Sequence, residues 1–151
     1  MIPKTMRALV CHGVGDYRLE EKPVPSPGPG EALVKVRHCG ICASDSKCHQ
    51  GAALFWGDDF RQAYVETPVI PGHEFTGEVV GLGEGGAERH GIGIGDRVVA
   101  EQIVPCMECR YCRTGYYWLC VKATVFGFKR SAQGGMAEYM IFPRHARVYR
   151  I

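Results

Sequence analysis

The chain lacks any apolar run long enough to cross a membrane. Its first apolar stretch, residues 8–11, ends at His12 and Gly13 and is too short for a signal peptide. It also lacks a strong excess of charge, because 18 basic residues stand against 16 acidic ones and the net charge is only +2. The basic residues are spread along the chain rather than gathered in a stripe. We therefore expect a cytoplasmic protein that binds neither nucleic acid nor membranes.

Long helical segments are missing as well. Twenty glycines and nine prolines divide the 151 residues into short runs, and the proline-rich segment 24–30 cannot be helical. Alternating or β-branched runs predict the strands, and helix is expected only after Cys42 and within a later cysteine cluster. The strands are expected at 6–11, 17–21, 31–39, 78–82, 97–102 and 137–142. This pattern predicts one mainly β domain, residues 1–151, built as an antiparallel sandwich or barrel.

Cysteine is abundant, and four of the eight cysteines follow the order C-x2-C-x2-C-x7-C. Four thiolates are the usual ligands of a tetrahedral structural zinc, and Gly115 lets the chain double back to deliver the last one. The alternatives are two disulfides or scattered buried thiols, but cysteines at such spacing in a reducing compartment are more often metal ligands. The sequence therefore predicts a zinc-binding lobe over residues 105–121. Its ligands are Cys106, Cys109, Cys112 and Cys120.

A second group of candidate ligands comes from two separate segments. Cys42 precedes Ser44 and Asp45, and His73, within Pro71-Gly72-His73-Glu74, lies 31 residues after Cys42. Catalytic zinc usually keeps three protein ligands and one open position, and Cys42, His73 and Glu74 could supply them. Taken alone, His73 would more often be an ordinary core histidine.

Two further motifs have simpler interpretations. Residues 81–86 match G-x-G-x-x-G, but a dinucleotide site needs a helix directly afterwards. The residues that follow are rich in glycine, so we expect a turn and no helix. Cys39 and Cys42 match a C-x-x-C redox pair, but the flanking residues do not form the βαβ unit that a thioredoxin-like site requires.

Together these motifs resemble the N-terminal, GroES-like catalytic domain of the zinc-dependent medium-chain alcohol and polyol dehydrogenases. The resemblance implies a partly open antiparallel barrel with a few short helices and a zinc-binding lobe. Within the family, residues 39–52 and 55–57 look most like dehydrogenases of short polyols such as threitol or erythritol. The matching stretches are residues 39–45, 71–77, 95–98, the four-cysteine lobe and 134–139.

The resemblance also implies roles for individual residues. Cys42 and His73 resemble the catalytic zinc ligands, and Glu74 resembles the carboxylate beside that zinc. Ser44 resembles the hydroxyl that relays the substrate proton, and Asp45 resembles the carboxylate that orients the histidine. The four later cysteines resemble the structural zinc ligands. The implied reaction oxidises an alcohol or polyol, with hydride transfer to NAD or NADP.

The chain departs from the family pattern in two ways. Lys47 stands where many members have a histidine in the proton relay, and His49 is the nearest replacement. The Rossmann domain that follows in the family, with the nicotinamide site and a third zinc ligand, is not part of these 151 residues. We therefore expect the fragment alone to be inactive and weakly loaded at the catalytic site. An apolar face, including Phe55 and Trp56, is expected to meet the missing domain and to favour homo-oligomers.

Two other readings remain open. One is a zinc-stabilised, GroES-like binding or assembly module with no catalysis of its own. The other is a thiol redox protein that uses Cys39 and Cys42. A cofactor domain downstream would favour the dehydrogenase, and a reversible disulfide would favour the redox protein.

Overall fold

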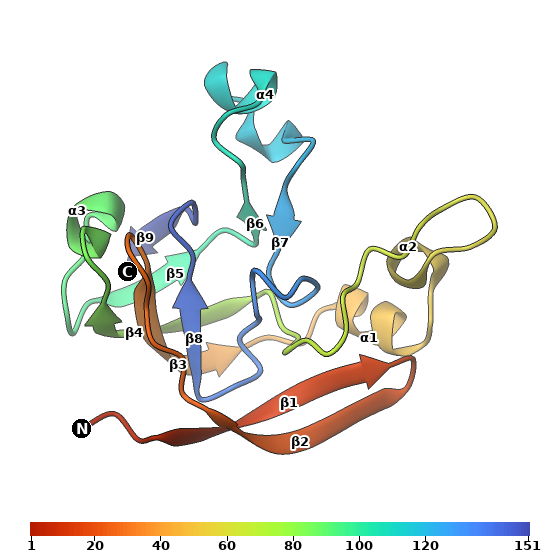
Figure 1. Cartoon of the computed structure of the whole chain (residues 1–151), viewed down its shortest axis with the longest axis horizontal. Helices are drawn as coiled ribbons and strands as arrows, with labels where there is room; N and C mark the ends of the chain where they lie inside the picture. Colours follow the sequence, from red (N-terminus) through yellow and green to blue (C-terminus); the bar gives the residue numbers. More distant parts are fainter.

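A five-stranded antiparallel sheet forms the centre of the molecule in the computed structural model, which describes residues 1–151 (Figure 1). Its strand order is β8-β3-β4-β5-β9. The central pair, β3 and β4, is the longest, and its register runs from Ala32 opposite Leu82 to Cys39 opposite Phe75. The strands are β3 (Ala32–Cys39), β4 (Phe75–Leu82), β5 (Arg97–Ala100), β8 (Tyr139–Phe142) and β9 (Val148–Arg150).

Apolar residues of this sheet form the main core. Phe75, Phe126 and Phe142 pack their rings 5.0 to 6.0 Å apart, and all three are buried. Val34, Val79 and Val98 complete this layer from three adjacent strands. Burial of these side chains is the main favourable term for the fold, because each removes a large apolar area from water.

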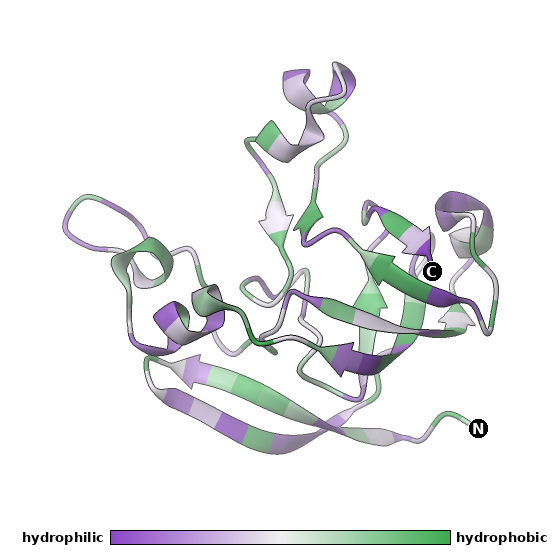
Figure 2. Cartoon of the chain, turned by 180° about the vertical axis from the view of Figure 1, so that it is seen from behind, coloured by the Kyte–Doolittle hydropathy of each residue, from purple (hydrophilic) through white to green (hydrophobic).

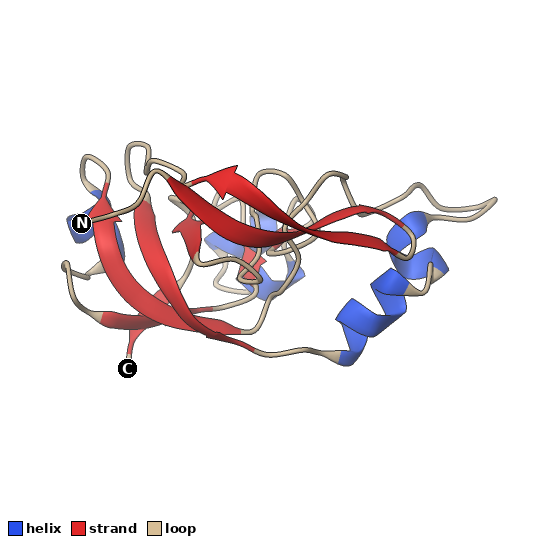
Figure 3. Cartoon of the chain, turned by 90° about the horizontal axis from the view of Figure 1, so that it is seen from below, coloured by secondary structure: helices blue, strands red, loops and turns tan.

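A two-stranded hairpin lies across the sheet (Figure 3). It consists of β1 (Thr5–Gly13) and β2 (Asp16–Pro23), which pair in antiparallel register around a turn that contains Gly15. The inner strand β1 buries Met6, Ala8 and Val10 against the sheet, whereas β2 carries mostly hydrophilic residues outward (Figure 2). Backbone bonds from Leu9 and Cys11 to the loops beside β1 close this edge of the barrel.

The helices are short. They are α1 (Ala43–His49), α2 (Ala53–Trp56), α3 (Gly86–His90), α4 (Arg110–Arg113) and a 3-10 turn, η1 (Tyr117–Leu119). None of them is long and apolar enough to span a bilayer. The four-cysteine lobe, which carries α4 and η1, projects from the body on two thin strands (Figure 1). These strands are β6 (Ile103–Val104) and β7 (Thr124–Val125), which pair with each other.

The mainly β class, the expected strands and the two expected helical regions are confirmed. Three expectations or omissions need correction. A one-turn helix, α3, does follow the glycine motif, because Gly85 adopts a left-handed conformation and starts the turn. Phe55 is buried against Phe128 rather than exposed on a docking face. The short elements β6, β7, β9 and α2 were not expected, because two to four residues show no measurable periodicity.

Candidate metal centres

The sheet register places Cys42 and His73 at the same end of the molecule. Strand β3 ends at Cys39 and strand β4 begins at Phe75, and these two residues are paired. Cys42 lies just beyond β3 at the start of α1, while His73 lies just before β4. Two segments that are distant in sequence therefore deliver their side chains to one point.

The turn that carries His73 depends on close backbone packing. Gly72 has a φ of +95°, and a Cβ at this position would lie 2.7 Å from the Cys39 sulfur. Gly134 packs directly against the carbonyl groups of Pro71 and Gly72, where no side chain fits. The amide of Gly135 also donates to the Gly72 carbonyl at 3.0 Å. The Pro71-Gly72 turn is therefore held from both sides, which fixes the direction of His73.

Cys42, His73 and Glu74 each offer a ligand atom, and these atoms all lie within 4.8 Å of one another. His73 is buried, Cys42 is half-buried and Glu74 is exposed, so the group opens to solvent on one side. Zinc bonds of about 2.0 to 2.3 Å in a tetrahedron would place such atoms about 3.3 to 3.6 Å apart. One thiol, one imidazole and one carboxylate within 4.8 Å of one another fit a zinc ion with an open position.

Ser44 and Asp45 flank the histidine ring on opposite nitrogens. The Ser44 hydroxyl lies 2.9 Å from His73 Nε2, and Asp45 Oδ1 lies 3.5 Å from Nδ1. The other carboxylate oxygen, Oδ2, accepts the Cys42 amide at 2.9 Å and so fixes the start of α1. Asp45 thereby links the backbone of one candidate ligand to the ring of another.

These contacts change the acidity of both donors. The Asp45 carboxylate raises the pKa of the His73 imidazole to about 9, against the opposing effect of burial. The Ser44 hydroxyl, together with His73, lowers the pKa of the Cys42 thiol. The Asp45 carboxylate thus favours the protonated form of His73, and a bound metal would have to displace that proton.

The four-cysteine lobe brings four ligand atoms together within the same limit of 4.8 Å. The sulfur of Cys112 lies 3.9 Å from that of Cys106 and 3.6 Å from that of Cys109, and Cys109 lies 3.8 Å from Cys120. Zn–S bonds of about 2.3 Å in a tetrahedron require S···S separations of about 3.8 Å. A disulfide would require about 2.05 Å, and all eight cysteines are free. The lobe is therefore spaced for a zinc ion and not for disulfides.

Backbone groups in the lobe further favour thiolates. Amides of Cys106 and Cys109 donate to the sulfurs of Cys120 and Cys106 at 3.4 and 3.3 Å. The Cys112 amide is the main cause that lowers the pKa of Cys109 to about 6, while loss of hydration raises the pKa of Cys112 to about 12. Four crowded thiols cannot all ionise without a cation, and a zinc ion supplies that charge.

Cys39 and the glycine motif lie outside these centres, whereas Cys42, the other half of the C-x-x-C pair, belongs to the first one. Burial raises the pKa of the Cys39 thiol to about 11, which disfavours the thiolate that redox exchange needs. The glycine motif ends in α3, which has only one helical turn and leads into a strand antiparallel to β4, so it does not form a βαβ unit. Lys47 is exposed, and the His49 ring packs on Tyr17 with centroids 5.0 Å apart.

The structure adds residues that the sequence did not indicate. The Phe128 ring packs against the His73 ring, with the two centroids 5.3 Å apart. A groove of about 410 Å³ runs beside His73 and Glu74 and is also lined by His38, Thr76 and Gln102. No motif marks these residues, because they reach the site only through the sheet and the loop after β7.

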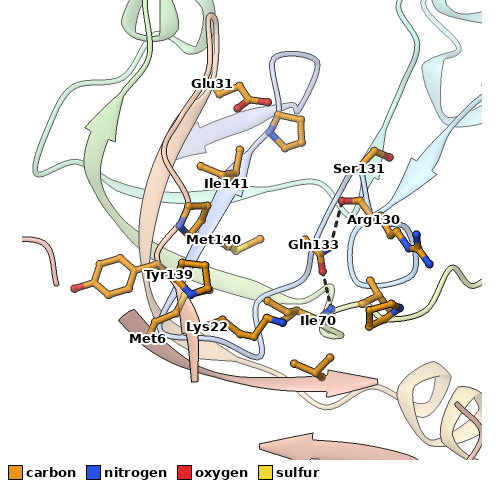
Figure 4. Close-up of a pocket in the computed structure, with 16 residues that line it drawn as sticks. Met6, Lys22, Glu31, Ile70, Arg130, Ser131, Gln133, Tyr139, Met140 and Ile141 are labelled. Carbon is orange, nitrogen blue, oxygen red and sulfur yellow. Dashed lines mark hydrogen bonds between the residues drawn. The ribbon is translucent and has the colours of Figure 1, made fainter. Parts of the chain in front are cut away.

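A separate cavity of about 460 Å³ lies between the hairpin and β8 (Figure 4). Met6 and Tyr139 line it, and the Gln133 side chain accepts the Ile70 amide at 2.6 Å on its wall. It contains none of the predicted ligands. The predicted ligands therefore all lie in the two candidate metal centres.

Several known proteins are similar to this chain in sequence and fold. The family model of the alcohol dehydrogenase GroES-like domain matches residues 28–151. The chain is 56% identical to an erythritol/L-threitol dehydrogenase of Mycolicibacterium smegmatis over 99% of its own length and 41% of that protein. A thermostable alcohol dehydrogenase from Pyrobaculum aerophilum superposes with a TM-score of 0.77 at 33% identity, covering 97% of this chain and 41% of that one. The 2R,3R-butanediol dehydrogenase from Bacillus subtilis gives a TM-score of 0.77 at 32% identity, covering 97% and 40%.

Proposed function

Because the chain belongs to the alcohol dehydrogenase GroES-like domain family, we propose that it is the catalytic domain of a zinc-dependent dehydrogenase of small polyols. The chain spans 41% of the erythritol/L-threitol dehydrogenase that it resembles. NAD or NADP would therefore bind to a part of the intact enzyme outside these residues. The observation that carries the proposal is the convergence of Cys42, His73 and Glu74 within 4.8 Å.

Cys42, His73 and Glu74 would hold the catalytic ion, and the four-cysteine lobe would hold a structural one. A zinc ion at the first site supplies Lewis-acid chemistry, which lowers the pKa of a bound alcohol. The open side at Glu74 leaves room for a substrate oxygen. Hydride transfer itself belongs to the nicotinamide cofactor.

Ser44 and Asp45 have distinct roles in this proposal. With His73 Nε2 serving as a metal ligand, the Ser44 hydroxyl would be free of its present bond to that nitrogen and could accept the proton of the substrate alcohol while it passes its own proton outward to solvent. Asp45 would hold the Nδ1–H of His73 and so orient the ring toward the metal. Both residues lie on α1, so one helix positions the ligand Cys42 and its two supporting groups.

The groove beside the site supports a polyol rather than a simple alcohol. His38, Thr76 and Gln102 contribute polar side chains to its wall, next to His73 and Glu74. Such groups can form hydrogen bonds to the substrate hydroxyls that are not oxidised. The similarity to the erythritol/L-threitol dehydrogenase supports the same substrate class.

Cobalt substitution tests the proposal on this chain. Two Co²⁺ ions should bind, one with a four-sulfur spectrum and one with a mixed S/N/O spectrum. Erythritol should perturb the mixed spectrum at lower concentration than propan-1-ol does. Cys42→Ser should abolish only the mixed spectrum. A single bound ion, or a mixed site that responds to neither alcohol, would instead support the non-catalytic zinc-stabilised module.

The location and assembly of the protein are also proposals. Eight free cysteines, four of them spaced for metal, support a reducing compartment such as the cytoplasm. Exposed apolar side chains on the lobe, including Trp118, Leu119 and Val121, support self-association. Sedimentation velocity over a range of concentrations would test whether oligomers form.

A further inference from the structure

The four-cysteine lobe has a thin attachment to the body. Its strands β6 and β7 share only two residue pairs, Ile103 with Val125 and Val104 with Thr124. One more backbone bond, from the Phe126 amide to the Gln102 carbonyl, closes the base of these strands. Such a short ladder would leave the lobe free to pivot unless other contacts hold it.

Glu101 supplies those contacts. It follows β5, and its Oε1 accepts hydrogen bonds from the Tyr117 and Tyr149 hydroxyls, each at 2.7 Å. Tyr117 belongs to the lobe and Tyr149 belongs to β9. A single carboxylate oxygen therefore joins the lobe to the main sheet.

Arg147 completes the junction. Its Nε lies 3.6 Å from the same Glu101 oxygen, and its guanidinium carbon lies 4.0 Å above the Tyr117 ring. The Arg147 carbonyl also accepts the Glu101 amide at 3.0 Å. The charge and the ring contact both hold Tyr117 in one orientation, and bonds to an ionised carboxylate are stronger than bonds between neutral groups.

We propose that Glu101 is a positioning residue that fixes the four-cysteine lobe against the main sheet. The junction also fixes the neighbouring Gln102, which lines the groove beside His73 and Glu74. The orientation of the lobe is thereby connected to one wall of the candidate substrate groove. This role does not depend on the reaction proposed above.

Hydrogen exchange of the zinc-loaded chain tests this inference. Glu101→Gln keeps the shape of the side chain but removes its charge. Amides of residues 102–104 and 124–126 should then exchange about tenfold faster, because one charge-assisted junction is lost. Amides of β3 and β4 should keep their rates, and the zinc content should not change.

Glu108→Gln is the matched control. Glu108 lies on the lobe and pairs only with the exposed Lys122, so its neutralisation should leave these rates unchanged. Tyr117→Phe and Tyr149→Phe each remove one hydroxyl and should give intermediate rates. These two variants also test the junction if Glu101→Gln does not fold.

The titration of Tyr117 gives a second readout that general loss of stability would not move. The bond to Glu101 raises the pKa of the Tyr117 hydroxyl. In Glu101→Gln, a tyrosine Cζ signal assigned to Tyr117 should titrate at lower pH, and in Glu108→Gln it should not shift. Equal exchange rates in the Glu101 and Glu108 variants, or an unchanged Tyr117 titration in Glu101→Gln, would overturn the inference.

Discussion

In the four-cysteine lobe three pairs of sulfurs lie 3.6 to 3.9 Å apart within one short segment, whereas the centre of Cys42, His73 and Glu74 joins two segments that are distant in the sequence. The lobe takes its ligands from residues 106–120, so local turns are enough to arrange them. Cys42 and His73 are 31 residues apart and meet only when β3 and β4 have paired. The comparison teaches that one centre is built by local structure and the other by the whole sheet.

The two centres also differ in the hydrogen bonds and protons at their ligand atoms. In the lobe, backbone amides donate to the sulfurs of Cys106 and Cys120, although the raised pKa of Cys112 means that a cation must displace the proton of that thiol. At the other centre, Ser44 bonds to the nitrogen that a metal would use, and the pKa of His73 is raised to about 9. A metal must displace both a hydrogen bond and a proton there. We therefore expect tight binding in the lobe and weaker, pH-dependent binding at Cys42.

The largest effect is expected from Cys109→Ser. Loss of one thiolate should release the lobe metal completely, because structural zinc sites contribute their binding energy to local folding. Zinc content should fall by one equivalent, and the lobe should exchange rapidly while the main sheet stays protected. Cys39→Ser is the control, because it removes a thiol outside both centres. Retention of the lobe metal in Cys109→Ser would contradict the claim that the four cysteines form one metal site.

Phe128→Ala should have the reverse effect of Cys109→Ser, because it should weaken metal binding at Cys42 and leave the lobe metal in place. Phe128 is 4% exposed and packs on both His73 and Phe55. Its loss should cost about 3 to 5 kcal/mol of unfolding free energy and weaken metal binding at Cys42, with the lobe metal retained. Denaturant unfolding and metal titration measure the two effects.

Phe60→Ala is the matched control for that substitution, because Phe60 is 95% exposed. It should change stability by less than about 0.5 kcal/mol. Equal effects of the two substitutions would mean that Phe128 does not support the site.

The next largest effect is expected from raising the pH, which should lower the unfolding free energy of the metal-free protein. The pKa of His73 is raised in the folded state, so its contribution to stability is fully present below about pH 6.5 and is lost as the pH rises through about 9. The loss should be at most about 3 kcal/mol. Metal affinity at Cys42 should rise over the same range, since fewer protons compete. Asp45→Asn should flatten the stability profile, and an unchanged profile in that variant would assign the dependence to another group.

The smallest effect is expected from Asp45→Asn on metal binding itself. Above pH 9 the imidazole is deprotonated in both proteins, so only the orienting role of the carboxylate remains. Affinity at the Cys42 centre should fall by about tenfold, as is typical when the partner of a ligand histidine is lost. Isothermal titration with zinc measures it. The exposed Asp59→Asn should bind like the unmodified chain, and an equal loss there would remove the special role of Asp45.

Much of this arrangement could be predicted from the sequence. The cysteine spacing indicated the lobe, and alternation with turn residues indicated the β fold, because both signals are local. Phe128, Gln102 and Glu101 could not be predicted, since they gain their roles from contacts between distant segments. The helix α3 and the burial of Phe55 were missed for the same reason: tertiary packing overrides local propensity.

Zinc release from the fully loaded chain, followed with a chelating dye, tests the central claim of two unequally organised centres. The account predicts two zinc ions per chain, one lost quickly and one slowly. Cys42→Ser should remove only the fast phase, and Cys109→Ser should remove only the slow one. A single phase, or a slow phase that disappears in Cys42→Ser, would contradict it.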